Sequence, residues 1–178
     1  MTFLLLFMFV IQTNSFSQKG KYYIAGKLKV EKGGLKDAQI TIEKNGQKVK
    51  SEFVTSSNFA YELDFQSKYV ISFSKPGYVT KKISFSTTVP TDLVGQEFAP
   101  FEFEVNLFKQ YDGVNTIMFN QPVGKISYSA DMDDFTWDTD YTKSIQSALD
   151  KIMEEVAEKV KEEEKNQSIA EKQAVITC

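Results

Sequence analysis

The stretch KYVISFSKPGYVTKKISFST, from Lys68 to Thr87, gives the clearest prediction of the fold. Apolar side chains occupy positions of one parity in each half: Tyr69, Ile71 and Phe73, then Val79, Ile83 and Phe85. Successive side chains of a β-strand point to opposite faces, so each half predicts a strand with one apolar face. Pro76-Gly77 between the halves suits a tight reversal, because proline fixes its own φ and glycine accepts a positive one. Two half-buried strands of this kind need a second layer that covers their apolar face.

Alternation of the same kind continues on both sides of this stretch, in segments 22–30, 35–43, 47–55, 59–65 and 101–108. Asn45-Gly46 joins two of these segments and is a strong hairpin signal, because both central positions of that turn favour positive φ. The return strand of the hairpin carries Val49 and Phe53. Short strands at regular spacing are typical of a sandwich. The sequence therefore predicts a mainly β chain whose residues 21–108 form an immunoglobulin- or prealbumin-like antiparallel β-sandwich of about seven strands.

Composition excludes several classes of chemistry. The 178 residues carry a formal net charge of −3, which argues against nucleic acid as a partner, since phosphate contacts need a concentrated basic surface. The chain has no histidine and one cysteine, Cys178, so a Ser-His-Asp triad, a Cys-His pair and an internal disulfide are all excluded. We therefore expect a protein that is not an enzyme and that has no cofactor. The 15 phenylalanines and 8 tyrosines are expected to serve mainly in packing.

The amino terminus predicts export. Thr2 to Ile11 is apolar over about ten residues, which is too short for a membrane-spanning helix of about twenty. Ser15 and Ser17 are small residues that suit cleavage after Ser17, although no lysine or arginine precedes the apolar run. The alternative is a buried core segment. We expect residues 1–17 to be a signal peptide, with no transmembrane segment left after its removal. The destination is then the periplasm, the outer cell surface or the extracellular space.

Residues 21–88 resemble a known module. Four pieces carry the resemblance: Gly26-Lys-Leu-Lys-Val30, Gly33-Gly-Leu-Lys-Asp-Ala-Gln-Ile-Thr-Ile42, Asn58-Phe-Ala-Tyr61 and Tyr69-Val-Ile-Ser-Phe-Ser-Lys-Pro-Gly-Tyr-Val-Thr80. Their order is similar to that in the carboxypeptidase regulatory-like (transthyretin-like) β-sandwich module of secreted and envelope proteins. Asn58 stands where that family often has glycine before the aromatic residue, and asparagine tolerates the same backbone region. The resemblance implies a non-catalytic accessory or adhesive module.

Residues 109–141 are expected to form an irregular segment with short strands near 117–119 and 125–128. The segment contains an acidic run with the aspartates Asp131, Asp133, Asp134, Asp138 and Asp140. Calcium binds several carboxylate oxygens on one loop, so a calcium site is one interpretation. The run lacks the spacing and the glycine of an EF-hand, and the alternative is a solvated acidic loop that Phe135, Trp137 and Tyr141 anchor on the sandwich. Asp140 is a candidate cap for the helix that follows.

Residues 142–170 change to a helical period. Apolar residues recur at spacings of three and four, at Ile145, Leu149, Ile152, Val156 and Val160. Charged residues fill most of the other positions, so one long amphipathic helix is predicted at the carboxyl end. Its apolar stripe has two possible uses. The helix packs on or projects from its own domain, or it self-associates as a coiled coil.

These features predict a non-catalytic accessory, adhesive or scaffolding module of the cell envelope, whose partner is an envelope protein or a glycan. One alternative is a carbohydrate- or peptide-binding module that uses exposed aromatic side chains. Its candidate ligand-binding residues are Tyr111, Tyr128 and Trp137. A second alternative is a binding module that calcium stabilises at the aspartates of the acidic run.

Overall fold

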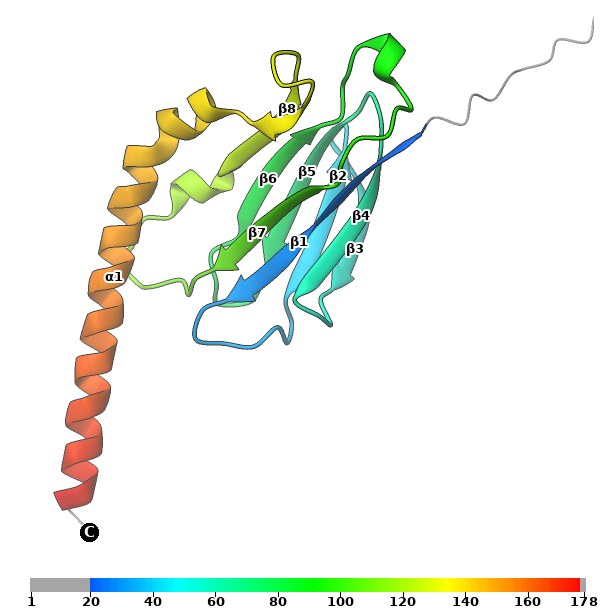
Figure 1. The fold of residues 1–178 in the computed structure, drawn as a ribbon. Coiled ribbons are helices and arrows are strands. Elements are labelled where there is room, and N and C mark those ends of the chain that lie inside the picture. The colour runs from blue at the N-terminus through cyan, green and yellow to red at the C-terminus, as the bar shows by residue number, and fades with distance from the viewer. Residues whose placement is uncertain (1–19, 177–178) are drawn as a thin grey trace, which may run out of the picture.

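The structure is a computed structural model that describes residues 20–176, and it contains two β-sheets followed by one long helix (Figure 1). The strands are β1 (Lys21–Val30), β2 (Gln39–Lys44), β3 (Gln47–Phe53), β4 (Asn58–Asp64), β5 (Lys68–Ser74), β6 (Lys81–Ser86), β7 (Phe101–Leu107), β8 (Gly124–Ser129) and β9 (Asp134–Trp137). The helices are two short 3-10 turns, η1 (Thr91–Leu93) and η2 (Ile117–Asn120), and α1 (Thr139–Ile176). The predicted signal peptide, residues 1–17, lies outside the described residues.

The two sheets differ in width. A six-stranded sheet has the order β3-β2-β5-β6-β8-β9, and a three-stranded sheet has the order β4-β1-β7. Most neighbours are antiparallel, but β1 pairs with β7 and β6 pairs with β8 in parallel. The prediction of a mainly β sandwich followed by a long helix is confirmed. Two further strands extend the larger sheet: β8, which was expected near 125–128, and β9, which was not expected.

The β5–β6 hairpin lies inside the larger sheet, as its alternation predicts. Tyr69 is paired with Phe85 and Ile71 with Ile83, and all four side chains are buried in the core between the sheets. Gly77 supplies the positive φ that the reversal needs, at 78°. The opposite layer contributes Tyr22, whose ring centroid is 4.1 Å from that of Phe135 on β9. The core is therefore closed by aromatic rings from strands that are far apart in the sequence.

A second apolar cluster joins α1 to the sandwich. Its buried members are Val79, Phe108, Tyr111, Val114, Phe119, Ile152 and Val156. Val79 was expected to share a face with Ile83 and Phe85, but it lies before β6 begins, and its N–H donates to the carbonyl of Phe108. It therefore packs in the second cluster instead of the main core.

The helix begins and ends outside its predicted limits of 142 and 170, and it both packs and projects. Ile145, Ile152 and Val156 are buried, so this part of the apolar stripe is used within the chain. Further along, Glu163 pairs with Lys109 and Glu164 with Lys32 on loops of the sandwich. Side chains from 165 to 173 are all exposed, and α1 runs on past the sandwich (Figure 1).

One short strand was predicted in the wrong place. Residues 117–119 form part of η2, whereas the strand expected at 125–128 is present as β8. The N–H of Ile117 donates to the side-chain oxygen of Asn115, and the N–H of Phe119 donates to the carbonyl of Thr116. These local bonds favour a tight turn over a strand because they satisfy the backbone without a neighbour.

Candidate functional site

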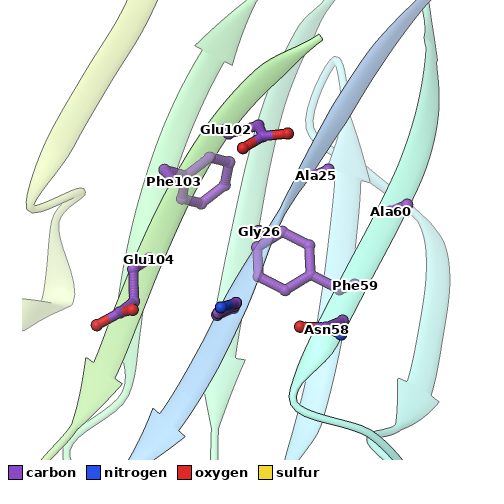
Figure 2. Close-up of a pocket in the computed structure, with 9 residues that line it drawn as sticks. Ala25, Gly26, Asn58, Phe59, Ala60, Glu102, Phe103 and Glu104 are labelled. Atoms are coloured by element: carbon purple, nitrogen blue, oxygen red, sulfur yellow. The ribbon is translucent and has the colours of Figure 1, made fainter.

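A hollow of about 650 Å³ lies on the outer face of the three-stranded sheet, and we call it the β1 hollow (Figure 2). Its lining comes from all three strands: Ala25, Gly26 and Lys27 of β1, Asn58, Phe59 and Ala60 of β4, and Glu102, Phe103 and Glu104 of β7. Ala25 is paired with both Ala60 and Glu102, so the central row has two methyl groups where larger side chains are usual. The small side chains leave the sheet surface hollowed at its middle.

Gly26 lies in the floor of the hollow, between the rings of Phe59 and Phe103 (Figure 2). A Cβ added at Gly26 would lie 2.0 Å from the carbonyl oxygen of Phe103 and 2.7 Å from Cζ of Phe59. Only glycine therefore permits this close approach of β1 to its neighbours. The two rings fill the space on the inner side of the glycine and are themselves buried in the core.

The rim of the hollow mixes hydrogen-bond acceptors and donors. Glu102 and Glu104 contribute carboxylates, and Lys27 and Asn58 contribute an ammonium and an amide. Glu104 also accepts an ion pair from Lys29 at 2.8 Å, and both side chains are well exposed. Such a rim suits a polar ligand that carries both donors and acceptors, such as a sugar or an extended peptide.

Tyr23 extends the same face and was missed in the sequence analysis. Its side chain is 51% exposed, whereas its neighbour Tyr22 is buried in the core. Side chains alternate along β1, so Tyr23 shares the outer face with Ala25 and Lys27. The Tyr22-Tyr23 pair at the start of a predicted strand was the available signal, since one tyrosine of such a pair must point outward.

The aromatic residues selected from the sequence lie in two different places. Tyr111 is buried in the second apolar cluster, under α1. Trp137 packs edge-on against Phe101 and Phe103, with ring centroids 5.6 and 6.2 Å apart. Tyr128 lies near Phe135 on the same hairpin as Trp137, and its hydroxyl donates to Asp133 at 2.6 Å. The structure thus brings Tyr128 and Trp137 onto one hairpin and places Tyr111 elsewhere.

The five aspartates are distributed along the β8–β9 hairpin and the start of α1. Asp131 and Asp133 lie in the turn, and Asp134 begins β9 and accepts the N–H of Phe135. Hydrogen bonding to Asp133 raises the pKa of the Tyr128 hydroxyl to about 12. Within residues 20–176, no three histidine, cysteine or acidic side chains are grouped so that they could hold a metal ion.

The helix cap is Asp138, where the sequence suggested Asp140. The carboxylate of Asp138 accepts the N–H of Tyr141 at 2.8 Å, and its carbonyl accepts the N–H of Thr142. This is the geometry of a residue just before the first helical turn. Asp140 lies inside that turn, because α1 begins earlier than its apolar stripe, and it is 3.9 Å from Lys143.

A charged cluster joins the two sheets where β1 begins and where β2 and β4 end. Asp64 on β4 accepts hydrogen bonds from Lys21 on β1 and from Lys44 on β2. The bond from Lys21, followed by that from Lys44, lowers the pKa of Asp64 to about 2. The hydroxyl of Tyr69 accepts the backbone N–H of Asp64, which fixes the end of β4.

Lys81 is the cation most affected by burial among the described residues with a shifted pKa. Its Nζ lies 5.2 Å from the ring centroid of Phe108 and 6.0 Å from that of Phe119. Burial lowers its pKa, and the charge of Glu31 opposes this effect. The side chain therefore lies at the edge of the second apolar cluster as a partly desolvated cation held over two ring faces.

Comparison with known proteins adds no relative. No protein-family model, curated protein or solved structure matches this chain. The resemblance of residues 21–88 to the carboxypeptidase regulatory-like module therefore stays a prediction. Across residues 20–176, no helix combines the length and the apolar character needed to cross a membrane.

Proposed function

We propose that this chain is an exported, non-catalytic module of the cell envelope, in which a sandwich holds a helix that assembles with another envelope component. The observation that supports the proposal best is the course of α1. Ile152 and Val156 fix its first half in an apolar interface, and the side chains from 165 to 172 are exposed. A scaffolding element requires a fixed base and an exposed continuation.

The ionisable groups with perturbed pKa values support the non-catalytic part of the proposal. Asp64 is engaged in two ion pairs between strands, and the hydroxyl of Tyr61 donates to Glu52 across the two sheets. Burial, followed by this bond, raises the pKa of Tyr61, and the same bond lowers that of Glu52. Each of these pKa shifts comes partly from a hydrogen bond between two strands, and these bonds hold the strands together.

Site-specific crosslinking in the native cell tests the role of the helix. A photo-crosslinking amino acid is placed at Ile169, which is 44% exposed on the projecting part of α1. The control position is Met132 in the β8–β9 turn, which is also exposed. We expect one discrete envelope partner from position 169 and none from position 132. Equal labelling from both positions, or none from either, contradicts the proposal.

Export is tested separately by the mass of the protein recovered from the envelope fraction. Removal of residues 1–17 is expected, because Ser15 and Ser17 suit signal-peptidase cleavage. Recovery of the full-length mass from the cytoplasmic fraction contradicts export. The export result and the crosslinking result are scored separately.

A second candidate function is binding of a glycan or an extended peptide on the outer face of the three-stranded sheet. The observation that favours it is Tyr23, an exposed aromatic ring on the same face of β1 as Ala25 and Lys27 of the β1 hollow. Titration with cell-wall glycan fragments and with peptides tests this function. We expect Tyr23→Ala to weaken binding by at least about tenfold, and Met132→Ala to leave it unchanged. Equal affinities for both variants contradict this candidate.

A further inference from the structure

The free edge of β3 is exposed and carries apolar side chains. β3 is the first strand in the order of the six-stranded sheet, and β2 is its neighbour on one side only. Every side chain of β3 except that of Glu52 is exposed. Val49 and Phe53 are 57% and 69% exposed, and Phe53 has the largest value among the exposed large apolar residues of the described chain. An edge of this kind is a template for pairing with another strand.

The backbone of β3 presents hydrogen-bonding groups to that edge. The N–H of Val54 donates to the carbonyl of Ala38, so the backbone groups of Val54 are directed at β2. Backbone groups along a strand alternate between its two neighbours. Ser51 and Phe53 lie an odd number of residues from Val54, so their N–H and C=O groups are directed away from β2. The side chain of Ser51 is also 3.0 Å from that of Thr41, as expected for a pair that does not exchange backbone bonds.

The sequence of β3 is complementary to itself about Ser51. When two copies pair antiparallel with Ser51 opposite Ser51, Lys50 of each copy faces Glu52 of the other. The same register brings Phe53 of each copy near Val49 of the other, and Val49 lies at a β-bulge where the β2–β3 register shifts. Ser51 exchanges backbone hydrogen bonds with its counterpart, because its free groups are directed at the edge. Charge and backbone bonding thus agree on one register.

Neighbouring registers are disfavoured by charge. Centring the pair on Lys50 places two ammonium groups opposite each other, and centring it on Glu52 opposes two carboxylates. Directly opposed like charges destabilise a strand pair. Lys50 and Glu52 also contact Tyr61 on the core side, and charged side chains on that side protect an edge against indiscriminate pairing. Lys50 and Glu52 form an ion pair with each other at 3.1 Å, and a partner that supplies the opposite charges in reverse order is complementary to this pair.

We propose that the β3 edge binds a second copy of this chain, forming a two-fold symmetric dimer in which the six-stranded sheets of two protomers are continuous through Ser51. The surface patch is the same on both protomers, as a two-fold interface requires. The edge lies at the side of the sheet away from α1, so the helices do not obstruct it (Figure 1). This proposal rests on β3 alone and is independent of the proposed envelope function.

Exchanging the charges of Lys50 and Glu52 tests the proposed pairing of two β3 strands. Sedimentation equilibrium of the purified full chain is expected to show a concentration-dependent dimer. Lys50→Glu and Glu52→Lys each oppose like charges, and each is expected to raise the dimer dissociation constant by at least about tenfold. The double exchange, Lys50→Glu with Glu52→Lys, is expected to restore dimerisation. Lys27→Glu on the outer face of β1 is the matched control and is expected to leave the dimer unchanged.

A crosslink tests the two-fold axis directly. In a Cys178→Ser background, Ser51→Cys is expected to form a disulfide between protomers, because opposed residues of a bonded pair lie about 5.5 Å apart at Cα. Lys48→Cys is the control and is expected to remain reduced. A wild-type monomer at all concentrations, a dimer that Lys50→Glu leaves intact, or a failure of the double exchange to restore it overturns the proposal. Circular dichroism establishes that each variant is folded before it is scored.

Discussion

The carboxylate of Asp64 accepts a hydrogen bond from the ammonium of Lys44, and this pair connects the last residue of β4 to the last residue of β2. The two strands belong to different sheets, so the pair closes one end of the sandwich. Lys21 supplies a second cation to the same carboxylate. The contact is polar and partly solvated, so its contribution is smaller than that of the buried rings beside it.

The first prediction concerns the pH dependence that Asp64 imposes. Its pKa of about 2 lies below the ordinary value of 3.8, so the folded state favours the ionised form. The stabilisation is fully present above about pH 4 and is lost as the pH falls towards 2. Because the group is partly exposed, Asp64→Asn is expected to cost about 1 kcal/mol at pH 7 and much less at pH 2. Urea unfolding at both pH values measures this, with Glu62→Gln on the same strand as the control.

The second prediction concerns Lys81, whose pKa is lowered by burial. The unfolded chain then binds more protons than the folded chain below the ordinary pKa of 10.5, so stability rises with pH as that value is approached. Lys81→Met retains the apolar stem and is expected to stabilise the protein by up to about 1 kcal/mol at pH 7. The alkaline rise in the free energy of unfolding should disappear in this variant and persist in Lys36→Met, a substitution at an exposed lysine.

The third prediction concerns the glycine in the β1 hollow. Gly26→Ala places a methyl group against the backbone of β7 and the ring of Phe59, and we expect a loss of about 3 kcal/mol in unfolding free energy. Gly34→Ala is the matched control, because a Cβ there meets no atom within 4 Å. Thermal and urea unfolding compare the two variants. Equal unfolding free energies for the two variants would show that β1 and β7 can move apart without a loss of stability.

The fourth prediction compares the same substitution at two positions of α1. Ile152→Ala removes a buried side chain from the second apolar cluster and is expected to cost about 2–4 kcal/mol. Ile169→Ala alters an exposed position beyond the sandwich and is expected to change stability by less than about 0.5 kcal/mol. Hydrogen exchange should show faster opening of the first half of α1 in Ile152→Ala alone. Equal effects at both positions would contradict the docked helix.

The fifth prediction distinguishes the two candidate helix caps. Asp138→Ala removes the acceptor of the Tyr141 N–H and is expected to cost about 1 kcal/mol. Asp140→Ala removes a favourable charge in the first turn and an exposed ion pair with Lys143, and it should cost less than half as much. Urea unfolding at low ionic strength measures both values. A larger effect from Asp140 would return the cap to the position suggested by the sequence.

Alternation predicted most of the fold because it depends on neighbours in the sequence. Tyr69, Ile71 and Phe73 are buried as their spacing requires. The same rule did not place Val79, since the strand is interrupted before Lys81 and alternation does not continue across a break. Nor could it predict that β8 pairs in parallel with β6, because a parallel pair has no connecting turn to mark it.

The candidate site was harder to predict for a related reason. A hollow depends on which small residues become neighbours across strands, and Ala25 meets Ala60 and Glu102 only through the register. Aromatic residues were selected from the sequence for their identity, and their exposure depends on what covers them. Tyr111 is covered by α1, whereas Tyr23 is 51% exposed.

The placement of β8 and β9 has a consequence for biosynthesis. Phe135 stacks near Tyr22, so the wall of the core against the first strand is completed only by residues close to the start of α1. A nascent chain that has emerged from the ribosome as far as β7 contains Phe65, Phe85 and Phe98, which also pack against Tyr22, but it lacks Phe135. The last ring of this part of the core is therefore supplied only when the β8–β9 hairpin has been synthesised.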